Sequence, residues 1–303
     1  MATVLPLIQT ALELGLIGSL TVLALFLSYS MLNVCDLSTD GCFTLGASVG
    51  AVIAISGHPY LSIPAAMLAG VSSGFITAIL QTRMGVDSLL AGIIMNTALY
   101  SVNIGIMGGS SLLNMNKTET VFTKVSDLLG KDAPEVYRLV IAVIAVFIVA
   151  AFLYMFLKTR IGLAIRATGN NPEMVRSSSI NPSMTTIVGL CVSNSFTALS
   201  GCLLAQSQKS VNIDIGTGMV TIALASLLIG GTFIRSRRMG FRIMGTVIGA
   251  FVFRLVYTIA LRFNMPAYML KLVSSVIVII AISGPYLKSR FPEFCRRLEK
   301  KRC

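Results

Sequence analysis

The chain lacks the charged surface of a soluble protein. Only 12% of its 303 residues are charged, whereas soluble domains carry roughly 25%. Hydrophobic residues make up 55% of the chain, and apolar runs long enough to cross a bilayer, about 20 residues, recur along it. These runs are too long and too little alternating for barrel strands, and irregular backbone cannot face lipid. The composition therefore predicts an all-α, polytopic membrane protein.

Sequence motifs for covalent chemistry are also missing. The chain has no Walker A pattern, no dinucleotide-binding Gly-rich turn and no zinc-ligand spacing. Its six cysteines predict reduced, mostly structural thiols without a disulfide framework. The single histidine, His58, stands near a span end before Pro59, where an interface role is favoured over a proton relay. We expect no catalytic residue and no metal bound by this chain.

Nine membrane spans are predicted from the apolar runs. They are Leu7–Met31, Gly41–Gly57, Tyr60–Arg83, Ser88–Met107, Tyr137–Leu157, Ser183–Ser207, Gly216–Ile234, Phe241–Arg262 and Met269–Leu287. The second span is short, and it follows the polar residues 35–40, which indicates a broken helix that lines a cavity. A second break is indicated in the seventh span by Gly216, Gly218, Gly230 and Gly231.

The distribution of positive charge predicts the orientation. A net charge of +12 would suit a nucleic-acid-binding protein, but the basic residues cluster at span ends, so we expect no nucleic-acid partner. Residues 158–182, 235–242 and the tail 288–303 are basic and fall on one side of the membrane, whereas loop 108–136 carries mixed charge. The basic side is expected to be cytoplasmic, with the N-terminus outside and the C-terminus inside. No cleavable signal peptide is evident, and residues 1–303 form one membrane domain.

The insert 158–182 is the main polar interruption of the chain. Two short helices are predicted in it, Arg160–Gly169 and Pro172–Ser179. Pro172 suits a first helical turn, and Asn171 is placed to cap it. A chain that only had to cross the bilayer would need a short turn here, so we expect contact with a cytoplasmic component. An ordinary basic loop is the alternative, and it is the stronger interpretation for residues 235–242.

Several motifs resemble those of ABC importer permeases of the ribose and branched-chain amino acid class. Residues 36–47, DLSTDGCFTLGA, resemble the DLS-x-G-x-x-x-LGA stretch of that class. Residues 162–171, GLAIRATGNN, resemble its coupling loop, although Ser177–Ser179 replace the small-residue and Gly positions. SFTALSG (195–201), LIGGT (228–232) and GTVIGA (245–250) resemble its later spans. The resemblance runs from about Leu14 to Leu287, lacks the first span of the ribose permeases, and is greatest to the tryptophan/tyrosine import permease group.

The resemblance implies a permease subunit of an ATP-driven importer in a prokaryotic inner membrane. It implies a second permease copy, an extracytoplasmic solute-binding protein and cytoplasmic ABC ATPases, which would hold ATP-Mg, so this chain would bind no cofactor. The solute would be an aromatic or branched-chain amino acid, with a sugar or nucleoside as the alternative. The insert would dock on the ATPase, and the coupling residues implied are Gly162, Arg166, Gly169, Asn170, Asn171, Glu173 and Arg176.

Polar residues within spans are the candidates for a translocation pathway. Asn96, Thr97, Tyr100 and Asn103 are predicted to form one helical stripe that faces a cavity or another helix. The full candidate set is Asp36, Ser38, Thr39, Asn96, Tyr100, Asn103, Asn194 and Gln206. Interhelical hydrogen bonding is an equal alternative for these side chains, and capping of the second span is one for those at 36–39.

Charge inside the spans is nearly absent, which bears on the class of transporter. Arg254 lies within a predicted span and needs a partner, for which Glu13 or carbonyls of the broken helices are candidates. We favour a structural or subunit-interface role for this arginine. Glu13 is the one acidic residue within a span, so an ion-coupled secondary transporter, the main alternative class, is disfavoured. A channel is weaker still, because no filter-like sequence appears.

Overall fold

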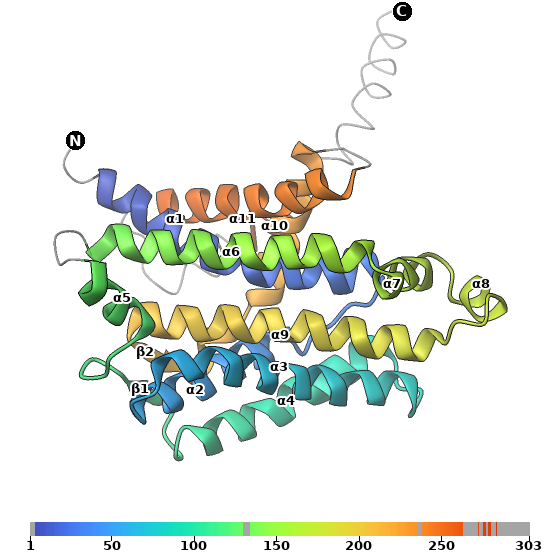
Figure 1. Cartoon of the computed structure of the whole chain (residues 1–303), viewed down its shortest axis with the longest axis horizontal. Coiled ribbons are helices and arrows are strands. Elements are labelled where there is room, and N and C mark those ends of the chain that lie inside the picture. The colour runs from blue at the N-terminus through green and yellow to red at the C-terminus, as the bar shows by residue number, and fades with distance from the viewer. Residues whose placement is uncertain are drawn as a thin grey trace, which may run out of the picture.

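The computed structural model describes residues 4–129, 134–234 and 238–262, with six single positions between 272 and 283. The described chain is a bundle of long helices lying side by side (Figure 1). The helices are α1 Val4–Leu25, the π-helix η1 Phe26–Met31, α2 Thr39–Ile55, α3 Pro59–Thr82, α4 Ser88–Ile106, α5 Val121–Leu129, α6 Pro134–Lys158, α7 Arg160–Asn170, α8 Pro172–Ser177, α9 Pro182–Gln208, the 3-10 helix η2 Ile213–Gly216, α10 Met219–Phe233 and α11 Met239–Arg262. Strands β1 Leu112–Asn114 and β2 Ser210–Asn212 pair antiparallel.

The all-α membrane fold is confirmed. Seven segments of the described residues are long and apolar enough to cross a membrane, and α2 is a shorter apolar helix. They correspond to the first eight predicted spans. The ninth, Met269–Leu287, lies mostly outside the described residues and the tail 288–303 lies wholly outside them, so the count of nine stays a prediction.

The seventh predicted span is broken at its start but not at its second pair of glycines. In the seventh span the chain breaks only before Met219, where Gly218 adopts φ +85°, and the helix runs through Gly230 and Gly231 without interruption. The reason is that Gly230 packs against α11 and keeps a helical backbone. The loop 108–136 contains β1 and α5.

Two three-helix units repeat the same order in opposite directions. Each has a long α-helix, a stretch that is not α-helical, a shorter α-helix and another long α-helix, α1–α2–α3 in the first unit and α9–α10–α11 in the second. The leading helices are antiparallel neighbours, because the Ser193 hydroxyl donates to the Ala24 carbonyl (2.8 Å) and the Ser200 hydroxyl to that of Ile17 (2.7 Å). Inverted repeats with broken helices are a common architecture of transporters.

Helix α9 lies at the centre and touches its neighbours backbone to backbone. A Cβ atom added at Gly46 of α2 would stand 2.0 Å from the Ala198 carbonyl oxygen, and one at Gly70 of α3 would stand 2.4 Å from that of Asn194. Gly201 of α9 approaches the Phe43 carbonyl equally closely. Between membrane helices, small residues allow this approach and the van der Waals contact that it brings. The glycines therefore determine how α2 and α3 sit on α9.

We expect Gly46→Ala to destabilise the protein by roughly 1–3 kcal/mol, because the added methyl overpacks a backbone contact. Gly18→Ala is the matched control, since a Cβ there meets nothing within 4 Å and alanine is the better helix former. The measurement is thermal unfolding of both variants in the same detergent. A Gly46→Ala protein as stable as the wild type would show that the α2–α9 contact is loose.

Candidate functional site

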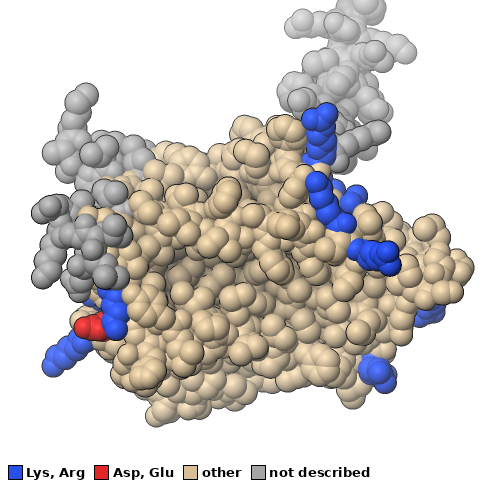
Figure 2. All heavy atoms as spheres, in the orientation of Figure 1, with Lys and Arg blue, Asp and Glu red and all other residues tan. Residues whose placement is uncertain are grey.

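The insert forms a polar corner at one end of the bundle. Figure 1 shows α7 and α8 at one end of the bundle, with α8 outermost, and Figure 2 shows Lys and Arg gathering at that end. The two predicted helices are confirmed, with ends within two residues of those expected. Asn171 caps α8 as predicted, because its Oδ1 accepts from the Met174 N–H at 3.1 Å, and Pro172 opens the helix. The Thr159 hydroxyl caps α7 in the same way.

The inner face of α7 packs against the ends of three spans. A Cβ atom at Gly162 would stand 2.2 Å from the Phe156 carbonyl oxygen of α6, and one at Gly169 would stand 2.1 Å from that of Met31 in η1. The hydroxyls of Thr168 and Thr185 lie 2.8 Å apart and join α7 to α9. Gly162 and Gly169, expected among the coupling residues, thus hold α7 on the bundle and face the spans.

The outer face of the insert carries the remaining coupling candidates. Asn170, Asn171, Glu173 and Arg176 are exposed, and Glu173 pairs with Arg176 at 3.8 Å. Arg166 is half-buried and lies near enough to Arg242 of α11 for the two charges to repel.

Exposed apolar side chains accompany these polar groups, and the sequence analysis missed them. Leu163 is 52% exposed and Met174 58% exposed, while Ile165 and Val175 are buried on the opposite side. Apolar residues rimmed by polar ones mark protein-interaction surfaces. The signal available in the sequence was the alternation of apolar residues within a polar insert.

Four pathway candidates meet in one buried cluster. Asp36 accepts from the backbone N–H and the hydroxyl of Ser38 through Oδ1, at 2.9 and 2.6 Å. Its Oδ2 accepts from the Asn194 amide at 2.8 Å, and its carbonyl accepts from the Thr39 hydroxyl. All four side chains are at most 2% exposed. The cluster joins the residues before α2 to α9, as the interhelical alternative predicted. Asp36 accepts from the N–H of the N-cap residue Ser38, whose own side chain makes no capping bond to α2.

Asp40 was missed by the sequence analysis. Its two carboxylate oxygens accept from the backbone N–H groups of Gly218 and Val220, both at 2.8 Å. The N-terminal ends of α2 and α10 therefore meet at this side chain. Carboxylates are favoured at helix N-termini, where the backbone N–H groups lack partners. The sequence offered a weak signal, an aspartate directly before an apolar run.

The polar residues of the stripe predicted on α4 do not all face the same way. Asn103 is 1% exposed and donates to the Gly41 carbonyl at 3.1 Å, and Asn96 also faces Gly41. Thr97 and Tyr100 point outward, and Tyr100 is 51% exposed. The single-face prediction was wrong because α2 covers only a narrow strip of α4.

Gln206 lies apart from the Asp36 cluster. Its amide nitrogen donates to the Ser62 hydroxyl at 2.6 Å, and its oxygen accepts from the Val121 N–H at 3.0 Å. It thus joins α9 to α3 and to the start of α5. Within one copy of the chain, its role is interhelical hydrogen bonding.

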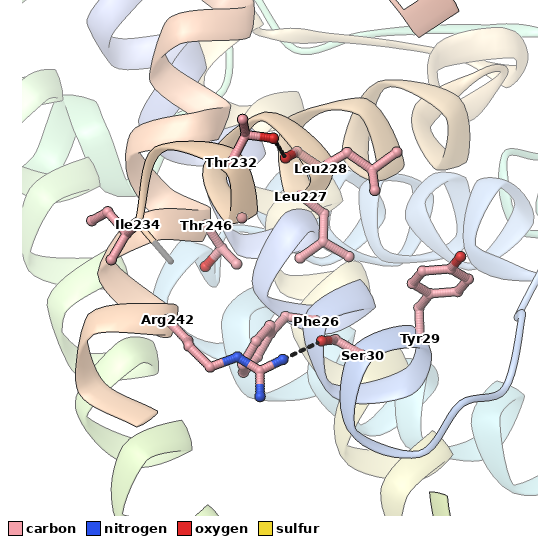
Figure 3. Close-up of a pocket in the computed structure, with 10 residues that line it drawn as sticks. Phe26, Tyr29, Ser30, Leu227, Leu228, Thr232, Ile234, Arg242 and Thr246 are labelled. Carbon is pink, nitrogen blue, oxygen red and sulfur yellow. Dashed lines mark hydrogen bonds between the residues drawn. The ribbon is translucent and has the colours of Figure 1, made fainter. Parts of the chain in front are cut away.

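A cavity of about 610 Å³ opens between η1, α10 and α11 (Figure 3). Arg242 donates from Nη2 to the Ser30 hydroxyl at 2.9 Å, and its guanidinium lies 5.4 Å from the centre of the Phe26 ring. Tyr29 and Thr232 also line the cavity. The π-helix that carries Ser30 ends at Met31, on which Gly169 of α7 packs. The cavity wall and the insert therefore share one segment of chain.

Glu13 and Arg254 do not form an ion pair in the described structure. The Glu13 carboxylate accepts from the Ser207 hydroxyl of α9. The guanidinium of Arg254 lies 5.1 Å from the centre of the Tyr257 ring, and its Nε has no hydrogen-bond partner among the described residues. Glu13, one of the two candidate partners of Arg254, is therefore not its partner in the described structure.

A family model described as the permease component of branched-chain amino acid transport systems matches residues 7–282. The chain belongs to this family. Its members are ABC-type transport permeases, so the chain is a transport component and not itself an enzyme, as the motifs at 36–47 and 162–171 predicted.

Relatives of this chain are named after different transported substrates. The chain is 31% identical over 266 residues to the tyrosine transport system permease protein of Clostridioides difficile, covering 88% of this chain and 86% of that one. It is 26% identical over 251 residues to the ribose import permease protein RbsC of Escherichia coli, covering 82% and 75%. A solved structure, PsaBC from Streptococcus pneumoniae in complex with Fab, is similar with a TM-score of 0.53, 15% identity and 94% of each chain covered. That likeness concerns the fold alone.

Replacing Asp40 with Asn should destabilise the protein by about 1.5–3 kcal/mol, because a charge-assisted pair of hydrogen bonds at a half-buried helix end is lost. Asp87→Asn is the control, since Asp87 caps α4 by one exposed bond to the Leu89 N–H and asparagine caps nearly as well. Chemical unfolding in detergent compares the two. Equal stability of both variants would contradict the role given to Asp40.

Proposed function

We propose that the chain is the membrane subunit of an ATP-driven importer that carries an amino acid. The observation that carries this proposal is the packing of α7. Gly162, Gly169 and Thr168 fix the helix to α6, η1 and α9, while its outer face is free of the bundle. A partner that pulls on the insert would therefore move the ends of three spans together, as a rigid body.

The partner that supplies the energy is a separate ABC ATPase, which binds ATP-Mg. The sequence has no nucleotide-binding motif of its own. Leu163 and Met174 provide apolar anchors, and Asn170, Asn171, Glu173 and Arg176 provide a polar rim around them. This arrangement of apolar centre and polar rim is typical of protein interfaces. By the same proposal, the half-buried Arg166 adds positive charge beside Arg242, at the junction between α7 and α11.

A second copy of the chain completes the pathway. Tyr100 and Thr97 would face lipid on an isolated copy, and polar side chains in such places are expected to face a partner or a water-filled route. The exposed face of α4 is thus proposed to lie against the second copy. An extracytoplasmic solute-binding protein would deliver the solute at the end opposite to α7. The basic α7 end is cytoplasmic in this proposal, the N-terminus is outside, and the membrane is the prokaryotic inner membrane.

An amino acid is preferred to a sugar as the solute. The cavity behind η1 places a guanidinium beside aromatic rings and hydroxyls, a combination suited to a carboxylate on an apolar body. The name of the relative from Clostridioides difficile supports an aromatic amino acid. The ribose permease relative supports the alternative, a sugar.

Transport by proteoliposomes tests the function. The chain is reconstituted with its ATPase and binding protein, and uptake of labelled tyrosine and labelled ribose is followed with and without ATP inside. We expect uptake of tyrosine that requires ATP hydrolysis. Uptake driven by an ion gradient without the ATPase would overturn the importer assignment, and ATP-dependent uptake of ribose alone would overturn the substrate.

The variant Met174→Glu should separate docking from folding. A carboxylate at this apolar anchor should weaken binding of the ATPase by about tenfold or more, as expected for loss of an interface anchor. Met84→Glu is the control, because Met84 is also exposed and lies in the turn between α3 and α4, outside the insert. Co-purification of the ATPase with each variant is the measurement. Loss of the ATPase from both variants alike would contradict a docking role for α8.

A further inference from the structure

A second cavity of about 610 Å³ is a groove on the outside of the bundle, between α6 and α11. Phe147 and Ala151 line it from α6, and Phe241 and Met244 line it from α11. Both helices are candidate membrane spans, and Phe147 is 73% exposed. Most of the side chains that line the groove are apolar, so it offers a surface suited to an acyl chain.

Small residues create the groove. Ala150 and Ala151 of α6 and Gly240 of α11 leave space where larger side chains would close it. A Cβ atom at Gly240 would touch the Tyr154 ring at 3.5 Å, so the ring lies directly over this glycine. The groove is therefore bounded at one end by Tyr154 and continues along the apolar faces of both helices.

The same end of the groove is positively charged. Arg238 lines it at the start of α11, and the Lys158 ammonium lies 4.2 Å from the centre of the Tyr154 ring, in the last turn of α6. No carboxylate of the described residues forms an ion pair with Lys158. The basic residues of this face gather at this end of the molecule (Figure 2). The cations thus stand at the level of lipid headgroups, next to an apolar channel.

We propose that this groove binds an anionic phospholipid. One acyl chain lies along Phe147, Ala151 and Met244, and the headgroup phosphate lies between Lys158 and Arg238. Basic pockets between membrane helices select anionic headgroups for this reason, because their charge is not cancelled by a choline or ethanolamine ammonium. The bound lipid joins α6 to α11 beside Thr159, the residue that caps α7.

Native mass spectrometry of the purified full-length chain tests the proposal. The protein is released from micelles containing equal amounts of phosphatidylglycerol and phosphatidylcholine, and the retained lipids are counted. The wild type should retain phosphatidylglycerol in preference. The double variant Lys158→Gln, Arg238→Gln should lower that retention by about tenfold or more, since each basic residue contributes to attraction of an anionic lipid.

The matched control removes two cations elsewhere, Arg83→Gln at the same end of the bundle and Lys117→Gln at the opposite end. It should retain phosphatidylglycerol like the wild type. Ala151→Phe fills the groove and keeps both charges, so it should displace the lipid while the thermal unfolding temperature shows that the protein is folded. Inorganic phosphate alone should not raise that temperature in the wild type.

Each contrary result would overturn the proposal. Equal retention of the two lipids by the wild type would show that the groove does not select charge. Unchanged retention of phosphatidylglycerol in the double variant would show that Lys158 and Arg238 do not bind the headgroup. Unchanged retention of phosphatidylglycerol in Ala151→Phe would show that the acyl chain does not lie in the groove. Stabilisation by inorganic phosphate as large as that by phosphatidylglycerol would show that the site binds an anion and not a lipid.

Discussion

The close contact of α9 with its neighbours is the constraint on which the rest of the structure depends. Lipid tails are as apolar as the helices they surround, so burial of apolar surface does not drive membrane helices together. Contact between backbones does, and here it requires glycine at positions such as 46, 70 and 201. Once α2 and α3 lie this close to α9, the Asp36 carboxylate comes within reach of the Asn194 amide, and the polar cluster forms as a result.

Breaking a helix inside a membrane exposes backbone N–H and C=O groups for which lipid offers no hydrogen-bond partner. In this chain, side chains supply the missing partners. Asp36 accepts from the backbone N–H of Ser38 at the start of α2, and Asp40 accepts from two backbone N–H groups at the start of α10. The two broken helices are thereby tied end to end. This link makes the inverted repeat a single mechanical unit, since neither short helix can shift along its axis without losing a charge-assisted bond.

The insert, the π-helix and the inner cavity form one connected path through the described structure. Helix α7 rests on Met31 through Gly169, and the same π-helix presents Ser30 to Arg242. Because packed helices switch between discrete arrangements and do not deform continuously, a displacement of α7 is expected to change the shape of the cavity. The lipid proposed between α6 and α11 would lie beside this path and stiffen it.

The sequence by itself determined the properties that depend on composition and local pattern. These are the helical membrane class, eight of the span positions, the basic end and the cap formed by Asn171, because each is written in residues close together in the chain. Only the tertiary structure decided that Gly162 and Gly169 face inward, that Tyr100 faces outward, and that Asp40 meets Gly218. Those outcomes depend on which helices approach each other and at what distance, and partners far apart in the sequence leave no local pattern from which this can be derived.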